Sequence, residues 1–245
     1  MRAVIVAAGR GKRLMPLTAE TPKPLLPVHG MPIIEYLLRG LRSADVSDII
    51  VVVRYLGDKI KEYYGDGSSL GMNISYVEQS EIAGTGAALL AVEDVVGDEP
   101  FMLLWGDILM DPDNYQRILD LFDGRPCDLI STLNWMDDVS AGASVVAEDG
   151  RIIRIIEKPP MGTAPSNWNQ AGLFVCTRAV FDAVRACRVS PRGEIEFTAG
   201  VQRLLHDGKD VRCMYLPKDG FWSDVGTPEI LAALNADPSV RELLR

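Results

Sequence analysis

Glycines and cations cluster directly after the first apolar run of the chain, residues 3–8. The loop at 9–13 reads GRGKR. Glycines let a backbone approach an anion with its N–H groups turned toward it, and the basic side chains add positive charge. The composition therefore predicts a loop that binds phosphate. It is neither of two common loops, because Leu14 stands where a dinucleotide fingerprint needs glycine and the GxxxxGK[ST] pattern is absent.

Two aspartates stand at the boundaries of expected elements. Asp107 follows Gly106 at the end of the apolar run 101–105, and Asp224 comes just before the last helical stretch. Ligands of parallel sheets bind outside the carboxyl ends of the strands, so Asp107 is expected to point into a site. An ordinary aspartate at the start of a turn is the alternative interpretation.

Further polar residues occur where a strand ends or a helix begins. They are Gln79 five residues before Gly84-Thr85, the pair Glu157-Lys158 after a strand-like run, and Asn169-Gln170 just before Gly172. A threonine between glycines suits a helix start, and charges often end a strand, so each group alone also fits a purely structural role.

The elements that must hold these residues alternate in the first half of the chain. Continuously apolar or strand-like runs lie at 3–8, 48–54, 74–79 and 101–107, with helical spacing at 33–41, 59–64 and 85–96. Strand, helix and strand at this spacing predict right-handed βαβ units and a parallel sheet. The second half is more mixed, with strands expected at 128–133, 143–148, 151–158 and 211–216 and helices at 179–187, 195–205 and 228–235.

The segment AAGRGKRLMPLTAETPKPLLPV, residues 7–28, resembles the signature of the sugar-1-phosphate nucleotidylyltransferase family. The likeness continues to GTPEIL at 226–231, and the members it is most similar to are uridylyl- and thymidylyltransferases that act on glucose 1-phosphate or N-acetylglucosamine 1-phosphate. The resemblance implies a single Rossmann-like α/β domain over residues 1–245, with three layers and a central, mostly parallel mixed sheet. Residues 1–125 are expected to bind the nucleotide and residues 126–245 the sugar phosphate.

The family resemblance also implies a role for each polar group. The nucleotide would be bound by Ala7, Ala8, Gly9, Gly11, Gln79, Gly84 and Thr85, the reacting phosphates by the catalytic residues Arg13 and Lys23, the sugar phosphate by Gly142, Glu157, Lys158, Asn169 and Gln170, and Mg²⁺ by Asp107 and Asp224. Magnesium takes few carboxylates and adds phosphate oxygens and water, which suits two aspartates and a nucleotide.

Three positions depart from the family pattern. Met15 replaces a frequent arginine, and Ala199 stands where relatives commonly carry aspartate. Relatives often read Asn-x-Gly at the sugar pocket, which puts Gln170 where the asparagine would be. Asn169 could serve there only if the chain shifts by one residue, so the sugar is left open.

Gln79 occupies the position that contacts the base in the resembled family. An amide offers both a donor and an acceptor and can pair with the N3–H and O4 edge of uracil or thymine. A carboxylate, which guanylyltransferases tend to carry there, would repel those carbonyls. Gln79 therefore favours UTP or dTTP as the NTP, with guanylyl or cytidylyl transfer as the alternative within the family.

Composition and charge exclude other classes. A net charge of −9 argues against a general nucleic-acid partner, and two histidines make a His-rich metal site improbable. The four cysteines have no CxxC pair, and no apolar run approaches a membrane span, so a cytoplasmic protein is expected.

The second functional class is a non-catalytic regulator that binds a nucleotide sugar. A homo-oligomer is possible, and a β-helix acyltransferase domain is not expected. An NAD(P)-dependent dehydrogenase is not expected, because Leu14 stands where its dinucleotide-binding fingerprint needs glycine.

Overall fold

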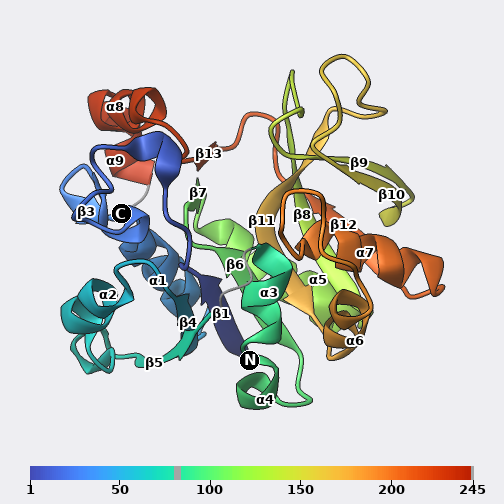
Figure 1. Ribbon diagram of the computed structural model, residues 1–245, viewed down its shortest axis with the longest axis horizontal. Helices are drawn as coiled ribbons and strands as arrows, with labels where there is room; N and C mark the ends of the chain where they lie inside the picture. Colours follow the sequence, from blue (N-terminus) through green and yellow to red (C-terminus); the bar gives the residue numbers. More distant parts are fainter. Residues whose placement is uncertain (80–83, 244–245) are drawn as a thin grey trace.

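The computed structural model describes residues 1–79 and 84–243, and a nine-stranded sheet runs through them (Figure 1). Its first part is parallel, in the order β5-β4-β1-β6. Continuous burial of β1 and β4 explains their unbroken apolar sequences, because a parallel strand is covered on both faces. The four strands are β1 (Arg2–Val6), β4 (Asp48–Val53), β5 (Asn73–Glu78) and β6 (Phe101–Trp105).

The second part of the sheet is mixed. β11 lies antiparallel between β6 and β8, β12 is parallel to β8, and the β9–β10 hairpin completes the order. One residue pair, Asn169 with Ser144, also joins β11 to β9. The expected mixed sheet is confirmed, but it is not mostly parallel: among the described residues the parallel pairs are β4–β5, β1–β4, β1–β6 and β8–β12, and the other pairs of this sheet are antiparallel. These strands are β8 (Leu129–Trp135), β9 (Ala143–Glu148), β10 (Arg151–Glu157), β11 (Trp168–Cys176) and β12 (Val211–Tyr215).

Helices cover both faces, so the expected three layers are confirmed (Figure 1). Successive residues of β1 alternate between two cores: Ala3 and Ile5 lie in one and Val4 in the other. The first core is covered by α1 (Ile33–Ser43), α2 (Gly57–Tyr64), α5 (Asp113–Gly124), α8 (Pro228–Ala236) and α9 (Pro238–Leu243). The second is covered by α3 (Thr85–Leu90), α4 (Glu93–Val96), α6 (Ala179–Arg185) and α7 (Phe197–His206).

Three expectations about individual elements need correction. The helix expected over 85–96 is two short helices, α3 and α4, separated by a turn at 91–92. Helix α5 and strand β11 were not expected at all, although β11 is the strand that joins the two parts of the sheet. Its polar start, Asn169-Gln170, and the glycine at 172 interrupt the apolar pattern that reveals a buried strand.

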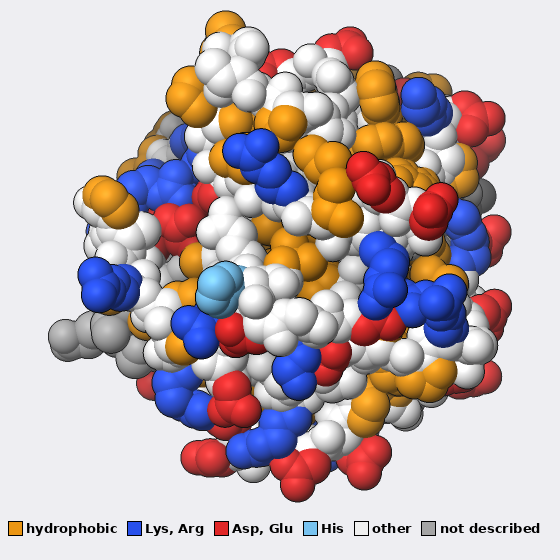
Figure 2. Space-filling view, turned by 90° about the vertical axis from the view of Figure 1, so that its right-hand side faces the viewer, with side chains coloured by type: hydrophobic (Ala, Val, Ile, Leu, Met, Phe, Trp, Pro, Cys, Tyr) orange, Lys and Arg blue, Asp and Glu red, His pale blue; other side chains and the backbone are white. Residues whose placement is uncertain are grey.

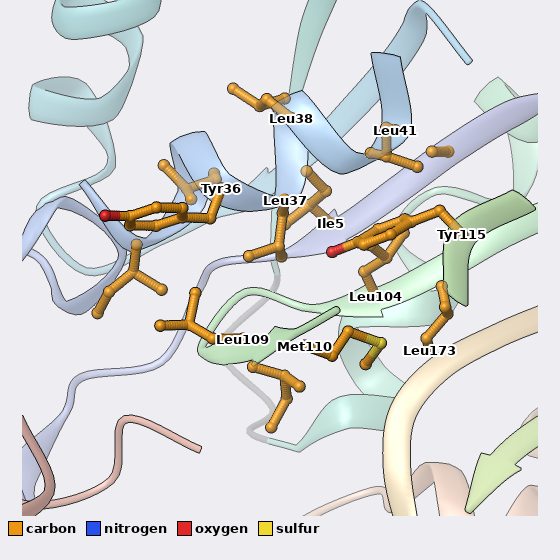
Figure 3. Packing of buried hydrophobic residues seen from close by; sticks show 14 of the residues in the cluster. Ile5, Tyr36, Leu37, Leu38, Leu41, Leu104, Leu109, Met110, Tyr115 and Leu173 are labelled. Atoms are coloured by element: carbon orange, nitrogen blue, oxygen red, sulfur yellow. The ribbon is translucent and has the colours of Figure 1, made fainter. Parts of the chain in front are cut away.

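A short ribbon, β7 (Ile108–Met110) paired with β13 (Trp222–Asp224), stands on the first core. Figure 3 shows how β7 is supported, with Leu109 and Met110 packed below α1. The other labelled side chains there come from α1, β1, β6, α5 and β11: Tyr36, Leu37, Leu38, Leu41, Ile5, Leu104, Tyr115 and Leu173. The β7–β13 ribbon therefore rests on a well-packed part of the first core, although each of its strands is only three residues long.

The face that carries α7 and the β9–β10 hairpin has acidic and basic side chains interspersed with apolar patches (Figure 2). Ion pairs such as Arg203–Asp207 and Arg151–Asp210 are partly exposed, and pairs of this kind contribute little to stability. Among the described residues, no helix is both long enough and apolar enough to cross a bilayer.

Glycine 40 allows α1 to approach α5 closely, which gives a test of the packing. A Cβ atom at Gly40 would lie 2.5 Å from ring carbon Cε2 of Tyr115, a side chain only 3% exposed. We expect Gly40→Ala to lower the free energy of unfolding by about 1–3 kcal/mol, the usual cost of overpacking. Urea unfolding measures this change.

Gly124→Ala is the matched control, because Gly124 also lies in a helix and a Cβ atom there meets nothing within 4 Å. We expect that control to keep or slightly raise stability through its better helix propensity. Equal effects of the two substitutions would contradict the packing argument.

Candidate active site

The glycine-rich loop that follows β1 is folded back on itself. Gly11 has a left-handed φ of 62°, and Thr18 Oγ1 donates to its carbonyl oxygen at 2.9 Å. A Cβ atom at Gly11 would lie 2.9 Å from Thr18 Cγ2 and 3.3 Å from Lys23 Cβ. The loop therefore needs glycine here, and it brings the base of Lys23 beside the segment that leaves Ala7 and Ala8, both of which are buried.

Asp107 and Asp224 come together through the β7–β13 ribbon. Asp224 pairs with Ile108, and the N–H of Val225 donates to the carbonyl oxygen of Asp107 at 2.9 Å. The backbone turn before Asp107 is fixed by Gly106, whose N–H donates to Val6 at the end of β1. Asp107, in the turn just before β7, and Asp224, at the end of β13, thus lie beside each other at the carboxyl end of the parallel sheet, as ligand sites of such sheets do.

Two cations face these carboxylates. Lys23 Nζ donates to Asp107 Oδ2 in a half-buried ion pair whose lysine side chain is only 11% exposed. A Cβ atom at Gly226 would lie 2.5 Å from Asp224 Oδ2 and 3.0 Å from Arg13 Nη2, so the guanidinium reaches the same corner. Lys23 and Arg13 of the loop after β1 therefore lie beside the carboxylates of Asp107 and Asp224.

The donor set at this point fits a hard divalent cation. Carboxylate oxygens are ligands that Mg²⁺ prefers, and Asp107 and Asp224 flank the same end of the β7–β13 ribbon. Within 1–79 and 84–243 no group of three or more His, Cys, Asp or Glu side chains is placed to hold a metal. A magnesium ion between Asp107 and Asp224 would consequently depend on phosphate oxygens and water for its remaining ligands.

The start of α3 is fastened to the segment before α7. Gln79 Nε2 donates to the carbonyl oxygen of Gly84 at 3.0 Å, and the N–H of Phe197 donates to Thr85 Oγ1 at 3.1 Å. A Cβ atom at Gly84 would lie 2.2 Å from the carbonyl oxygen of Ile195, so only glycine permits this approach. Gln79 and Thr85 are thus held by backbone contacts on either side of residues 80–83.

A cavity of about 210 Å³ opens beside the aspartates. Its wall combines residues that the sequence assigned to nucleotide, metal and sugar phosphate: Thr85, Asp107, Asp224, Gly142, Glu157, Asn169 and Gln170. These residues come from α3, the turn before β7, β13, β10, β11 and the loop before β9. The structure therefore brings seven of the expected site residues around one space, although they are spread over most of the chain.

Glu157 is held at the cavity wall by several partners. Thr198 Oγ1 donates to Glu157 Oε2 at 2.8 Å, and Arg192 Nη2 lies 3.5 Å from Oε1. Burial raises the pKa of the Glu157 carboxyl, and the threonine hydrogen bond and neighbouring cations oppose that rise. The next residue, Lys158, has a left-handed φ of 44° and donates its N–H to Gly142 at 2.7 Å. The backbone of Lys158 is thus fixed beside Glu157, and its partly exposed ammonium lies 3.9 Å from Glu157 Oε1.

Asn169 and Gln170 differ sharply in how their amides are used. Asn169 Oδ1 accepts from the N–H of Ala143 at 3.0 Å, and its Nδ2 donates to Asn134 Oδ1 at 2.9 Å. A Cβ atom at Gly142 would lie 2.1 Å from Asn169 Oδ1. Gln170 is only 9% exposed, and its Nε2 has no hydrogen-bond partner among the described residues. Asn169 therefore holds the wall together, whereas Gln170 lines the cavity with a buried donor that no described residue pairs with.

A bulge in β11 explains why the sequence alone left these two residues undecided. The pairing of β11 with β8 shifts register between Gln170 and Phe174. Gly172 lies in this interval with φ 90°, and a Cβ atom there would lie 2.8 Å from Trp105 Cδ1 and from Ile108 Cγ1. Bulges redirect side chains, and this one lets β11 pass close to β6 and β7.

Sequence reasoning missed several residues of the cavity wall, among them Trp105, Trp222, Met136 and Thr198. Trp222 also donates its indole N–H to the carbonyl oxygen of Ala171 at 2.8 Å. A signal was available for the two tryptophans, because each stands two residues before one of the expected metal ligands. Residues two apart in a strand share a face.

The sequence model of the nucleotidyl transferase family matches residues 2–239. The chain belongs to this family. Membership confirms the resemblance drawn from the segment at 7–28. It also accounts for a site built around the loop after β1.

Relatives in the nucleotidyl transferase family are similar over almost the whole chain. The low-salt glycan biosynthesis nucleotidyltransferase Agl11 of Haloferax volcanii is 32% identical over 96% of this chain and 65% of its own length. The glucose-1-phosphate thymidylyltransferase of Streptomyces antibioticus is 30% identical over the same shares, 96% and 65%. The bifunctional protein GlmU of Methanocaldococcus jannaschii is 32% identical over 95% of this chain and 53% of its own. The chain thus spans about half to two thirds of these relatives.

Solved structures share the fold. A Bacillus anthracis protein, provisionally described as a glucose-1-phosphate thymidylyltransferase and crystallised with sucrose, superposes with a TM-score of 0.87 at 28% identity, covering 99% of this chain and 96% of that one. A UDP-glucose pyrophosphorylase complexed with UDP-glucose superposes with a TM-score of 0.86 at 23% identity over 98% of both chains, which shows the fold alone. The expected nucleotidyltransferase type of α/β fold is confirmed.

The contrast between the two adjacent amides of β11 predicts a large loss of stability at one position and almost none at the other. Asn169→Ala leaves the N–H of Ala143 and the amide of Asn134 without their partner, so we expect a loss of about 2–4 kcal/mol in the free energy of unfolding. Gln170→Leu replaces an unpaired buried donor by an apolar group of similar size, and we expect a change within about 1 kcal/mol. Urea unfolding of both variants measures this, and equal losses would contradict the assigned roles.

Proposed function

We propose that this chain transfers a nucleoside monophosphate from an NTP to a sugar 1-phosphate and releases pyrophosphate. The observation that carries the proposal is the meeting of Lys23 and Arg13 with Asp107 and Asp224 at one edge of the cavity. Cations suit phosphates, and paired carboxylates suit the magnesium that accompanies them. Relatives whose names state nucleotidyltransferase or thymidylyltransferase activity support the same reaction class.

The reaction needs positioning more than proton transfer. A phosphate oxygen of the sugar 1-phosphate attacks the α-phosphorus of the NTP, and the bond from that phosphorus to the bridging oxygen of the β-phosphate breaks. The attacking oxygen is already anionic, so no general base is required. Catalysis then rests on alignment and on stabilisation of charge. In this proposal Arg13 holds the departing pyrophosphate, Lys23 the α-phosphate, and Lys158 the incoming phosphate.

Asp107 and Asp224 are the residues proposed to hold Mg²⁺. When bound, the ion would neutralise phosphate charge and so reduce the repulsion between two anionic substrates. Without substrate, the ammonium of Lys23 lies on the Asp107 carboxylate. We therefore propose that Lys23 exchanges this carboxylate for the α-phosphate when the nucleotide binds, which leaves Asp107 oxygen available to the metal.

The sugar would lie against β10 and β11. Glu157 can accept hydrogen bonds from sugar hydroxyls, and the buried Nε2 of Gln170 can donate one that the protein itself does not use. Because the Asn169 amide is engaged by Ala143 and Asn134, its proposed contribution is to hold Gly142 at the pocket. This assigns direct contact with the sugar to Gln170.

The base is proposed to lie beside Gln79 and Gly84, with the backbone of residues 7–11 along the nucleotide. An amide at position 79 favours uracil or thymine, and a thymidylyltransferase at 30% identity supports that preference. Guanylyl or cytidylyl transfer remains the alternative. The cytoplasmic location and a homo-oligomeric state stay predictions from sequence.

The decisive assay is pyrophosphate release with Mg²⁺, crossing UTP, dTTP, CTP, GTP and ATP with a panel of sugar 1-phosphates. We expect turnover with UTP or dTTP, and Lys23→Ala should lower it by about 10²–10³-fold, as for loss of a preorganised donor. Lys61→Ala, at a half-buried lysine of α2 that pairs with Asp58 and Glu78, is the control and should keep normal turnover. A near-normal rate in Lys23→Ala would refute the assignment.

Base reading is tested separately at Gln79. A carboxylate cannot donate to the base carbonyls and repels them, so we expect Gln79→Glu to lower kcat/KM for UTP and dTTP at least tenfold more than for GTP. Gln79 Nε2 also donates to Gly84, so the substitution removes a bond within the protein. The melting temperature of the variant therefore serves as the control for folding. Equal losses across all nucleotides would exclude a role in base selection.

A further inference from the structure

The turn between β4 and α2 binds the middle of the glycine-rich loop. Tyr55 Oη donates to the carbonyl oxygen of Thr18 at 3.0 Å and lies 3.2 Å from that of Ala19. Lys59 Nζ donates to the next carbonyl oxygen, that of Glu20. Three consecutive carbonyl groups of the loop thus accept from Tyr55 in this turn and from Lys59 in the first turn of α2. These contacts hold residues 18–20 against the segment that follows β4.

The ring of Tyr55 engages the start of the same loop. The guanidinium carbon of Arg10 lies 5.2 Å from the ring centroid, within the range of a cation–π contact. Tyr55 is half-buried and Arg10 is exposed. One tyrosine therefore holds the loop at two places, with its ring at residue 10 and its hydroxyl at residues 18 and 19.

The topology explains why this turn can reach the loop. β1 and β4 are parallel neighbours, with Val6 paired to Val52, so the segments that leave their carboxyl ends lie side by side. The loop after β1 carries Arg13, and Thr18 braces it by its bond to Gly11. Because Thr18 is bonded to Gly11, a shift of residues 18–20 would also move the part of the loop that carries Arg13.

We propose that Tyr55 is a positioning residue that holds the phosphate-binding loop in the geometry in which Arg13 and Lys23 meet the nucleotide. This inference rests on the proposed function for its kinetic consequence but not for its structural one. Tyr55 touches no reacting atom. It acts through the loop, so its loss should weaken the grip on nucleotide phosphates and on pyrophosphate while the sugar side of the cavity is unaffected.

The test compares Tyr55→Phe, which removes only the hydroxyl, with Tyr63→Phe, the same change at an exposed tyrosine of α2. Amide hydrogen exchange is measured first, in the free protein. The N–H groups of Ala19 and Leu25 donate to carbonyls within the loop and report its opening. We expect their exchange to be about three- to tenfold faster in Tyr55→Phe, as for loss of one hydrogen bond, and unchanged in Tyr63→Phe.

Kinetics separate positioning from a general structural role. We expect Tyr55→Phe to raise KM for the NTP, and KM for pyrophosphate in the reverse reaction, about three- to tenfold with an unchanged KM for sugar 1-phosphate. A lower melting temperature and a lower kcat with unchanged KM values would overturn the proposal, as would normal exchange together with normal kinetics. If the wild-type chain is inactive on the whole substrate panel, the proposed function fails, and the exchange comparison alone decides whether Tyr55 holds the loop.

Discussion

The pairing of β7 with β13 is the constraint on which the site depends. It is a ribbon of three residues on each strand, yet it joins a segment near the middle of the chain to one near the end. It places Asp107 and Asp224 side by side, and two carboxylates at that separation repel each other unless cations compensate them. Lys23 and Arg13 supply that compensation from the loop after β1. The β7–β13 ribbon and this loop therefore hold each other in place.

The site lies where the parallel and mixed parts of the sheet meet, at β6 and β11. Close approaches hold the walls of the site here: Gly84 faces the carbonyl group of Ile195 across the two halves of the chain, and Gly142 faces the side-chain amide of Asn169 within the second half. A Cβ atom would lie 2.2 Å from the first oxygen and 2.1 Å from the second, so a side chain at either glycine would push these segments apart. Glycine is therefore required at Gly142 by distance, and at Gly84 both by distance and by its φ of 112°.

The sequence predicted the parallel part of the fold well, because strands buried on both faces are continuously apolar, as at 49–53 and 101–105. It did not predict β11, since polar residues and a bulge at Gly172 break that pattern. Polar residues of the site were recognisable by type, but their partners were not. The engagement of Asn169 with Asn134 depends on the register of β8 and β11, which no local spacing encodes. The walls formed by Trp105 and Trp222 depend likewise on which strands become neighbours.

Two adjacent residues of β11 divide scaffold from selectivity. The amide of Asn169 is engaged by Ala143 and Asn134, whereas Gln170 lines the cavity and its Nε2 has no partner among the described residues. If Gln170 contacts the sugar as proposed, replacing it would change which sugar is accepted without loosening the wall, because the Asn169 amide continues to hold it. Sugar preference and stability would then depend on two different neighbours in the sequence, and the first could change in evolution while the second is kept.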